Sequence, residues 1–463
     1  MTTATDDLAA LAHLTTATRI GDLPEAVVSK ARYHLLDTLG AALAGAGSAE
    51  TTALLRMLTA TEPTAGPGAE ASVWGTGLAL SPRGAALVNG VSAHALELDD
   101  AGGCDHSGAV VVPAALAAVT AASAPVSGAD LLTAVVVGYD VARRVLEACG
   151  GYWPHNEEGW HSTGTCGPFG AAAAAAAVLR LDPDRTAHAL ALAGSFSGGI
   201  WAFVHDGAMS KRLHAGRAAE AGVTAALLAA HGVTGPAQVF ADVWGGFLRT
   251  FAPTSAEPAA LTAGLGREWR ISRCSLKPYA SCRSTHSAVD AVGAVLGVHS
   301  LSADDVAGIH VRLNPAVHSM CGGTDVATLA AAQLSLPYAV AARVALGGAG
   351  LDAYGEENRR SPRVRSVLER IVLEVDPAMD ADTEPVVTVT TRTGATYEQQ
   401  VADPLGSATN PLDGPAVRAK FDGLAARALP PEQAEAVADA VQRIEGLADA
   451  RTLVTLLGRQ NRR

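Results

Sequence analysis

The stretch GPFGAAAAAAA, residues 167–177, decides the fold of this 463-residue chain. Alanine is the best helix former, and its small side chain lets neighbouring helices approach closely. Aromatic residues are scarce throughout, with 6 Trp, 7 Tyr and 7 Phe, so the core has to be built from Ala, Leu and Val. The stretch therefore predicts a central buried helix in a helix-rich protein.

Helical periodicity extends outward from this stretch through the first half of the chain. Between Pro24 and Gly45 apolar residues recur at every fourth position, which keeps them on one helix face, and Pro24 stands where a first-turn proline belongs. Further helices are expected over residues 109–122, 130–149 and 218–231. The first half therefore predicts a helical domain.

The pattern changes after Ala252, where the segment APTSAEP is typical of a linker. Apolar and polar residues then alternate as in β-strands, over 309–313, 371–375 and 387–390, and Gly394 marks a hairpin turn. Helical periodicity returns from Pro415. We therefore predict a mainly α protein with an inserted α+β lid, in which 1–265 and 405–463 form the helical domain and 266–404 form the lid.

Charge and cysteine usage exclude several classes of protein. The chain has 34 basic and 46 acidic residues, a net charge of −12, and no basic stripe, which disfavours nucleic-acid binding. No signal peptide is recognised, and no apolar run reaches the length of a membrane span, so we expect a cytoplasmic protein. The six cysteines include no C-x-x-C pair, which disfavours zinc ribbons and iron–sulfur clusters.

Two polar stretches in the first half are candidates for chemistry. Residues 94–106 (HALELDDAGGCDH) hold four carboxylates and two imidazoles, which suit acid–base pairs or metal ligands, or else form a solvated helix end. Residues 159–170 place glycines before the alanine helix, where backbone N–H groups can bind an anion and His161 would stand at the mouth. Ordinary N-capping by Thr163 or Thr165 is the alternative.

Lysine marks two further stretches. Only four of the 34 basic residues are lysines, and Lys is a compact charge with a tunable pKa that Arg cannot replace. Lys211 lies in 209–216 (MSKRLHAG) and Lys277 in 277–286 (KPYASCRSTH). Such local basic pockets in an acidic protein suit a small di- or tricarboxylate, although surface turns are the alternative. Neither a P-loop nor a dinucleotide-binding glycine motif is convincing.

These motifs, in this order, resemble the MmgE/PrpD family, which includes 2-methylcitrate dehydratases, cis-aconitate decarboxylases and iminodisuccinate epimerases. The resemblance spans essentially the whole chain. It is carried by Asn89-Gly90, His94, Glu97 to Asp100, His106 with Gly108 and 113–117, Gly159-Trp160-His161 with Thr165 and Gly167, 211–216, Lys277-Pro278-Tyr279 with Cys282, Arg283 and His286, and Asn410-Pro411-Leu412 before Lys420-Phe421.

The resemblance implies a helical domain with a smaller α+β lid, a homodimer, and a pocket between the domains that needs no metal or other cofactor. It implies that the pocket aspartate of the decarboxylases is Glu97 here and that their threonine is Ala101. The loop from Asp100 to His106 is short, and Ser107 stands where many members have proline. The catalytic residues implied are His106, His161, Lys211, His286 and Tyr338. The substrate-binding residues implied are Glu97, Asp100, Ala101, Thr165, Gly167, Arg212, His214, Lys277 and Arg283.

The family's reactions start at a carbon beside a carboxylate, so donors are needed for the charge that develops on the carboxylate oxygens. Lys211, Arg283 and the helix mouth near Gly167 are expected to supply them. His161 is expected to be the principal acid or base with His106 as its partner. Tyr338 and His286 are expected to come from the lid and close the pocket.

The leading hypothesis for function is a cofactor-independent lyase on a small di- or tricarboxylate, with 2-methylcitrate dehydration as the default. An epimerase of the iminodisuccinate type or an aconitate decarboxylase is the alternative. Two remoter hypotheses are a magnesium-dependent prenyl or terpene enzyme, built on Asp99, Asp100 and Asp105, and a binding protein without catalysis. The scarcity of aromatic residues disfavours the former, because carbocations need an aromatic lining.

Overall fold

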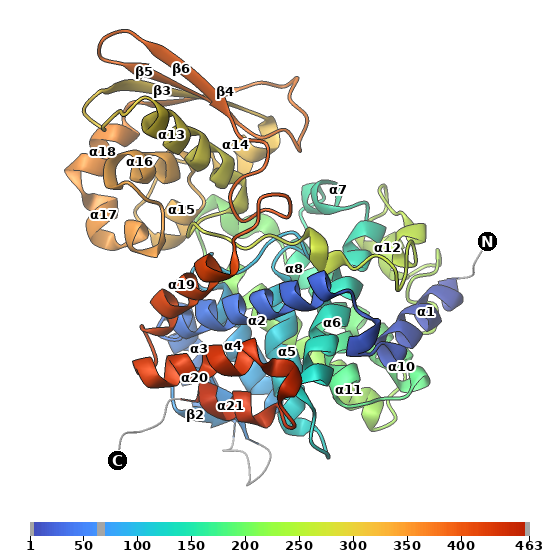
Figure 1. Cartoon of the computed structure of the whole chain (residues 1–463). Coiled ribbons are helices and arrows are strands. Elements are labelled where there is room, and N and C mark those ends of the chain that lie inside the picture. The colour runs from blue at the N-terminus through green and yellow to red at the C-terminus, as the bar shows by residue number, and fades with distance from the viewer. Residues whose placement is uncertain (1–3, 63–69, 459–463) are drawn as a thin grey trace.

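The computed structural model describes residues 4–62 and 70–458. Figure 1 shows two bodies, a large helical one that carries both ends of the described chain and a smaller one in which helices cover one face of a sheet. Their apolar interiors are separate clusters of buried side chains. The predicted fold class, a large helical domain with a smaller α+β domain, is confirmed.

The alanine stretch forms helix α9 (Gly167–Val178), which lies at the centre of the helical body. Six of its seven alanines are fully buried. It packs against α5 (Ser107–Ala121), α6 (Gly128–Ala148) and α11 (Ser210–Ala230). The approach is close enough that a Cβ added at Gly170 would lie 2.4 Å from the carbonyl oxygen of Gly138. Small residues at these crossings therefore set the spacing of the helices.

The other predicted helices of the first half are also confirmed, but the one expected over 218–231 is longer and begins at Ser210. The stretch after Pro24 is α2 (Glu25–Gly45), and the helix expected from residue 109 begins at Ser107. The remaining elements of the helical body are α1 (Ala4–Ala17), α3 (Ala49–Thr61), α4 (Pro82–His94), α7 (Tyr152–Glu157), α8 (Ser162–Thr165), α10 (Pro183–Ser195) and α12 (Phe247–Phe251). A short hairpin of β1 (Ala71–Val73) and β2 (Leu78–Leu80) was not anticipated from the sequence.

The smaller body is built on a four-stranded sheet in the order β4-β3-β5-β6. Its strands are β3 (Val306–Leu313), β4 (Ile371–Val375), β5 (Val386–Thr391) and β6 (Thr396–Gln400), so the three alternating segments and the hairpin at Gly394 are confirmed. The β3/β4 pair is parallel, and the other two pairs are antiparallel.

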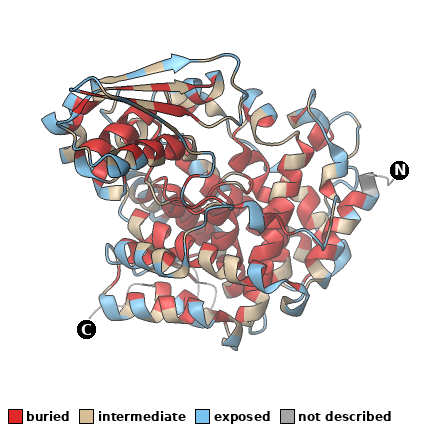
Figure 2. Cartoon of the chain, turned by 45° about the horizontal axis from the view of Figure 1, so that its top comes forward, coloured by how far each residue is buried: buried red, intermediate tan, exposed pale blue. Residues whose placement is uncertain are grey.

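Helices cover one face of this sheet, and its edge strands keep exposed residues (Figure 2). The helices of this body are α13 (His286–Val298), α14 (Pro315–Cys321), α15 (Leu329–Gln333), α16 (Leu336–Leu346), α17 (Glu356–Arg360) and α18 (Pro362–Leu368). Helix α13 contacts β5 and β6, and α16 contacts β4. Alternate residues of β3, among them Ile309 and Val311, point into this interface and are buried.

The chain returns to the helical body through α19 (Gly414–Ala425), α20 (Pro431–Gln442) and α21 (Arg451–Leu457), as the periodicity after Pro415 predicts. Helix α19 packs on α2, where Phe421 is fully buried. The segment proposed as a linker lies against the helical body, because Ala252 is buried and the N–H of Glu257 donates to the carbonyl of Ala148. The interior of the helical body includes Leu276, and that of the smaller body includes Ala280. The domain limits at 265/266 and 404/405 stay a prediction.

Among the helices of the described chain, none combines the length and the apolar character that crossing a lipid bilayer requires.

Candidate active site

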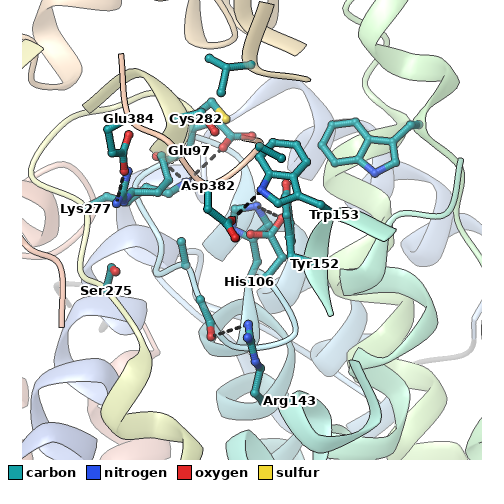
Figure 3. A pocket seen from close by; sticks show the side chains of 18 of the residues that line it. Glu97, His106, Arg143, Tyr152, Trp153, Ser275, Lys277, Cys282, Asp382 and Glu384 are labelled. Atoms are coloured by element: carbon teal, nitrogen blue, oxygen red, sulfur yellow. Dashed lines mark hydrogen bonds and ion pairs between the residues drawn. The ribbon is translucent and has the colours of Figure 1, made fainter. Parts of the chain in front are cut away.

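A cavity of about 310 Å³ lies where the two bodies meet (Figure 3). The helical body contributes a loop after α4, the start of α7 and the start of α11. The smaller body and the segment leading into it contribute the stretch around Lys277 and the loop between β4 and β5. The residues that line the cavity are Glu97, Ala101, Gly102, Asp105, His106, Arg143, Tyr152, Trp153, Trp201, Lys211, Ser275, Lys277, Cys282, Arg283, Ser284, Val317, Ala381, Asp382, Thr383 and Glu384.

The loop of residues 95–106 carries most of the charge in the helical wall. It connects α4 to α5. Two backbone hydrogen bonds join it to the segment that leads into the smaller body, from Ala101 N to Ser275 O at 3.0 Å and from Ser275 N to Ala101 O at 2.8 Å. Glu97 and Asp105 have positive φ angles of 52° and 93°, a conformation that is costly for residues with a side chain. Such backbone strain persists only where the surroundings fix it, and it is common at functional sites.

Glu97 is the centre of a buried cluster of cations. Its carboxylate contacts the Lys211 ammonium, lies 3.1 Å from the Arg212 guanidinium, and lies 3.2 Å from Lys277 Nζ. Burial alone would raise the pKa of Glu97, but Lys211, Lys277 and Arg212 hold it well below its ordinary value. The predicted residues Glu97, Lys211, Arg212 and Lys277 are therefore brought together as one ionised group.

His106 lies between two carboxylates. Its Nδ1 is 2.9 Å from Asp99 Oδ2, and its Nε2 is 3.2 Å from Asp105 Oδ2. Burial lowers the pKa of His106, but Asp105 and Asp99 outweigh it and raise the pKa to about 10. The two carboxylates therefore hold His106 as an imidazolium, in which both ring nitrogens are donors. Its neighbour His94 is neutral, because burial and the charge of His106 lower its pKa to about 3.

His161 stands behind Asp105 and does not line the cavity. Its Nδ1 lies 2.9 Å from Nδ1 of His214, and its Nε2 is 3.8 Å from Asp105 Oδ2 and has no hydrogen-bond partner among the described residues. Its ring packs against Trp201 and Phe203, with centroids 5.1 and 5.6 Å away. Burial, together with the nearby His214 and Lys211, holds the pKa of His161 well below its ordinary value, so this imidazole is neutral.

An ion pair and a hydrogen bond lie on the side of the cavity that the smaller body supplies. The Arg283 guanidinium is 2.9 Å from Glu384 Oε1, within that body. The indole N–H of Trp153, on α7, donates to Asp382 Oδ1 at 2.9 Å and so joins the two bodies (Figure 3). The loop between β4 and β5 therefore places one carboxylate, Glu384, on the predicted residue Arg283 and a second, Asp382, on Trp153.

The remaining predicted residues lie away from the cavity. Asp100 is paired with His34 at 3.0 Å and accepts from the N–H of Gly108, so it holds the loop against α2 and α5. The Thr165 hydroxyl is 2.7 Å from His155 Nε2. His286 and Tyr338 belong to helices α13 and α16 of the smaller body. His286 Nε2 faces the Ser281 carbonyl at 3.2 Å, and the Tyr338 hydroxyl donates to the Ala353 carbonyl at 2.6 Å.

The helix mouth near Gly167 does not form the expected anion site. Helix α8 runs directly into α9 through Cys166, which ends one helix and begins the other. The first N–H groups of α9 therefore meet the preceding turn, as in the bond from Phe169 N to Cys166 O. A Cβ at Gly167 would contact Ala218 and Val110, so the helix start is enclosed by packed side chains. Neither Thr163 nor Thr165 caps α9, whose N-cap residue is Cys166.

Sequence reasoning missed much of the cavity wall. Arg143 comes from a helix whose pattern indicates packing only, Tyr152 and Trp153 from a short helix that the sequence does not predict, and Asp382 and Glu384 from a loop without a motif. Cys282 and Ser284 lie in the stretch 277–286, and its basic residues Lys277 and Arg283 were a signal that could have placed them at the cavity. Asp105 belongs to the stretch in which carboxylate–imidazole pairs are expected, and the structure pairs it with His106.

Within residues 4–62 and 70–458, two groups of side chains have the spacing of metal ligands. They are His94, Asp99 and His106, and Asp105, His106 and His161, with ligand atoms within 4.8 Å of one another. His106 belongs to both groups, and a histidine has to be neutral at the ligating nitrogen to bind a metal. Because Asp99 and Asp105 hold His106 as an imidazolium, the arrangement favours an acid–base cluster. Asp100 faces His34 instead, so the three aspartates of the magnesium hypothesis do not converge.

Comparison with known proteins identifies the family. Residues 9–259 match the MmgE/PrpD N-terminal domain, and residues 279–445 match the MmgE/PrpD C-terminal domain. The chain is 29% identical to a cis-aconitate decarboxylase-like protein of Aspergillus oryzae, over 97% of this chain and 96% of the relative. It is 28% identical to the cis-aconitate decarboxylase of Aspergillus terreus, over 94% and 92% of the two chains. It is 29% identical to that of Homo sapiens, over 95% and 92%.

These matches agree with the motifs read from the sequence and cover both bodies. Decarboxylases are lyases, so the expectation of an enzyme of the lyase class is confirmed. The two domain models leave out only a short stretch at each end and the segment between them, which includes Lys277. The chain therefore belongs to the MmgE/PrpD family.

Proposed function

We propose that the chain is a decarboxylase of small unsaturated tricarboxylates, with cis-aconitate as the first substrate to test. The observation that carries this proposal is the imidazolium of His106 in a cavity wall that also holds Lys211 and Lys277. The relatives named as cis-aconitate decarboxylases support the choice of reaction. Dehydration of 2-methylcitrate, the default from sequence, becomes the second candidate.

The chemistry needs one proton and an acceptor for an electron pair. In cis-aconitate the bond between the methylene carbon and its carboxylate breaks, and CO₂ leaves without the bonding electrons. That pair forms a new double bond to the central carbon, and the old double bond shifts its pair to the far alkene carbon, which takes up a proton. The trianion and one proton thus give CO₂ and the dianion of methylenesuccinate (itaconate).

His106 is the group best placed to donate that proton. It lines the cavity as an imidazolium, and a positioned general acid of this kind contributes roughly 10²–10⁴ in rate. Asp99 and Asp105 fix the ring on both sides and stabilise its charge. The sequence favoured His161 for this role, but His161 is neutral and lies behind Asp105.

The cations of the cavity bind the substrate's carboxylates by competition with Glu97. Lys211 and Lys277 both contact the Glu97 carboxylate, which occupies the position that a substrate carboxylate would approach. Arg283 likewise faces Glu384 at 2.9 Å. A bound polyanion therefore takes over hydrogen bonds that the enzyme's own carboxylates make in its absence, and these charge-assisted bonds are the strong ones.

His161 is the observation that favours the second candidate. Dehydration and epimerisation both begin with removal of a proton, which needs an unprotonated base. His161 is neutral and its Nε2 has no partner among the described residues. Asp105 stands between this nitrogen and the cavity, however, so proton donation by His106 is the better-supported chemistry.

Proton NMR of the purified protein in D₂O tests the proposal directly. We expect cis-aconitate to lose CO₂ and to give methylenesuccinate with one deuteron at its saturated methylene carbon. The panel also holds citrate, 2-methylcitrate and iminodisuccinate. Water loss from 2-methylcitrate without reaction of cis-aconitate would establish the second candidate. Deuterium appearing in recovered iminodisuccinate, with no other change, would identify an epimerase, and silence with all four compounds would overturn the proposal.

The double variant Glu97→Asp with Ala101→Thr sharpens the substrate assignment. It introduces the aspartate and threonine that the family resemblance places in decarboxylases. If the native pocket is built for cis-aconitate, we expect the variant to change the KM of the reaction more than its kcat, because Glu97 contacts the carboxylate-binding lysines. A variant that gains decarboxylation absent from the native chain would instead show that the native substrate differs.

We also propose that the protein is a homodimer, as the family resemblance implies. Sedimentation equilibrium of the full chain measures this directly, and a single monomer mass across the concentration range would contradict it.

A further inference from the structure

Cys282 is only partly buried, unlike the other cysteines of this chain. All six cysteines lie within the described residues, and the other five are fully enclosed. Cys282 lies just before a short 3₁₀ turn (Arg283–Thr285), and its backbone N–H donates to the Gln333 carbonyl at 2.8 Å. Its side chain lines the active-site cavity together with Arg283 and Lys277 (Figure 3). A thiol therefore stands in the wall of a site that gathers cations.

The surroundings of Cys282 stabilise its thiolate. The Cys282 thiol lies 3.6 Å from Met320 Sδ. The interaction with Cys321, helped by nearby Lys211 and Lys277, lowers the pKa of Cys282 to about 6, although burial and Glu97 act against them. Burial raises the pKa of Cys104, Cys166 and Cys274 instead. Because the thiolate is the reactive form of cysteine, Cys282 is expected to be the reactive thiol of this chain.

We propose that Cys282 is a carboxylate-directed nucleophile, a site of covalent modification for small electrophiles that carry a carboxylate. The lysines that line the cavity bind the carboxylate of such a compound and bring its electrophilic carbon to the sulfur. Nearby Lys211 and Lys277 supply the binding charge, and the wall residue Arg283 adds to it. The site thus combines an anion-binding surface with a nucleophile.

The chemistry balances for two kinds of electrophile. With a haloacetate, the sulfur forms a bond to the methylene carbon and the halide leaves with its electron pair. With a carboxylate conjugated to a double bond, the sulfur adds to the far alkene carbon, and the electron pair moves to the carbon beside the carboxylate, which takes a proton from water. For methylenesuccinate as the electrophile, this inference rests on the proposed function. For a haloacetate it does not.

Parallel labelling with iodoacetate and iodoacetamide tests the inference on the full-length protein. The two reagents have the same leaving group and differ in charge, and peptide mass spectrometry gives the rate at each cysteine. We expect iodoacetate to label Cys282 about 10-fold or more faster than iodoacetamide, because a cavity lined by cations concentrates an anion. Free cysteine in the same buffer gives the reference ratio of the two rates.

Three controls separate this outcome from general reactivity. Cys282→Ser should abolish the fast labelling, and citrate at saturating concentration should slow it in the native chain. Lys277→Gln should lower the rate with iodoacetate more than the rate with iodoacetamide. Equal or slower labelling by iodoacetate, fast labelling at another cysteine, or no protection by citrate would overturn the inference. Since citrate protection needs no variant, the test holds even if Lys277→Gln does not fold.

A separate incubation with methylenesuccinate distinguishes this inference from the proposed function. An adduct of one molecule at Cys282 extends the inference to the product of the proposed reaction. If cis-aconitate is not turned over but iodoacetate still labels Cys282 preferentially, the proposed function fails and the carboxylate-directed thiol stands. If cis-aconitate is turned over and iodoacetate labels Cys282 no faster than iodoacetamide does, the proposed function stands and the carboxylate-directed thiol fails.

Discussion

Helix α9 and the loop of residues 95–106 are both buried, and they are built in opposite ways. The helix is a run of alanines with no charge, enclosed by other helices at contact distance. The loop holds Glu97, Asp99, Asp100 and His106, all buried and all ionic or paired with an ionisable partner. The helix is stabilised by close packing of apolar side chains. The loop is stabilised by ion pairs, which need both partners in their charged forms.

This difference predicts that the packing around α9 is insensitive to pH and salt, whereas the charged loop is sensitive to both. Close packing of apolar groups depends on volume and hardly on pH or salt. Buried charges are costly unless paired, and removing one partner leaves the other uncompensated. The helix therefore fixes the fold, and the loop carries chemistry that can be turned off without removing the fold. Each prediction below is designed to break or sharpen this comparison, in order of expected effect.

The largest effect is expected on activity from His106→Gln. The variant keeps the size of the side chain and removes the proton donor, so turnover of the true substrate should fall roughly 10²–10⁴-fold. The NMR assay measures the rate, and circular dichroism should show an unchanged helix content. His13→Gln, on an exposed side chain of α1, is the matched control and should keep full activity. Near-native turnover by His106→Gln would show that the proton comes from elsewhere.

Glu97→Gln should have the next largest effect, on stability. The variant leaves Lys211, Arg212 and Lys277 without their shared carboxylate, and breaking a buried ion pair typically costs about 3–5 kcal/mol. Urea denaturation measures the loss in the free energy of unfolding.

Citrate provides the internal control for this variant. A polyanion that binds the cations should restore stability to Glu97→Gln more than it stabilises the native chain, because the native lysines already have a partner. Equal stabilisation of both proteins by citrate would mean that the carboxylate of Glu97 does not occupy the anion site.

A pair of glycine substitutions tests the packing side of the comparison. Gly170→Ala places a Cβ 2.4 Å from the backbone oxygen of Gly138 and 2.6 Å from Ala142 Cβ, so helices α9 and α6 have to separate. Overpacking of this kind costs about 1–3 kcal/mol. Gly423→Ala is the matched control, since the same methyl group meets nothing within 4 Å on α19. There the substitution should stabilise the helix by roughly 0.5–1 kcal/mol. Equal effects at both positions would contradict the close approach at α9.

The smallest expected effect is the change in the free energy of unfolding for each unit of pH. His106 has a pKa raised to about 10 in the folded protein, so its contribution is complete below its unfolded pKa and is lost as pH rises through about 10. The loss is at most about 1.4 kcal/mol for each pH unit. Glu97 has a lowered pKa, so its contribution is present above its unfolded pKa and is lost as pH falls towards the folded value.

Denaturation series from pH 7 to pH 10 on the native chain and on His106→Gln isolate the contribution of His106. The alkaline decline in the free energy of unfolding should be smaller in the variant. The cost of Gly170→Ala should stay constant across the same range, because no titratable group takes part in that contact. Parallel pH curves for the native chain and His106→Gln would contradict the charged state of His106.

The sequence predicts what local patterns encode. The alanine run, the fourfold periodicity after Pro24 and the alternation through Ile309 each depend on near neighbours, and each gives the element expected. The strands of the hairpin at 71–80 have three residues each, too short for a period to appear. The continuation of α8 into α9 is missed because the glycines of residues 159–170 predict a helix start that is open to an anion.

The cavity was harder to predict, because its groups converge from distant segments. The motifs indicate that Glu97, Lys211 and Lys277 matter, but only the fold shows that two lysines and Arg212 share one carboxylate. Tyr338 illustrates the opposite case, since its hydroxyl is bound to the Ala353 carbonyl within the smaller body. A motif gives a residue's position along the chain, and the packing around it decides where the side chain points.

The hydrogen bond from Trp153 to Asp382 gives this protein an optical signal of its own. The indole N–H bonds across the junction of the two bodies, at the wall of the cavity. Indole emission moves to longer wavelength when the ring becomes solvated, so any separation of the bodies is visible as a shift in fluorescence without an added dye. Asp382→Asn, which weakens the same bond, assigns the signal to this tryptophan among the six in the chain. Stopped-flow fluorescence can therefore time the approach of the two bodies independently of the chemical step.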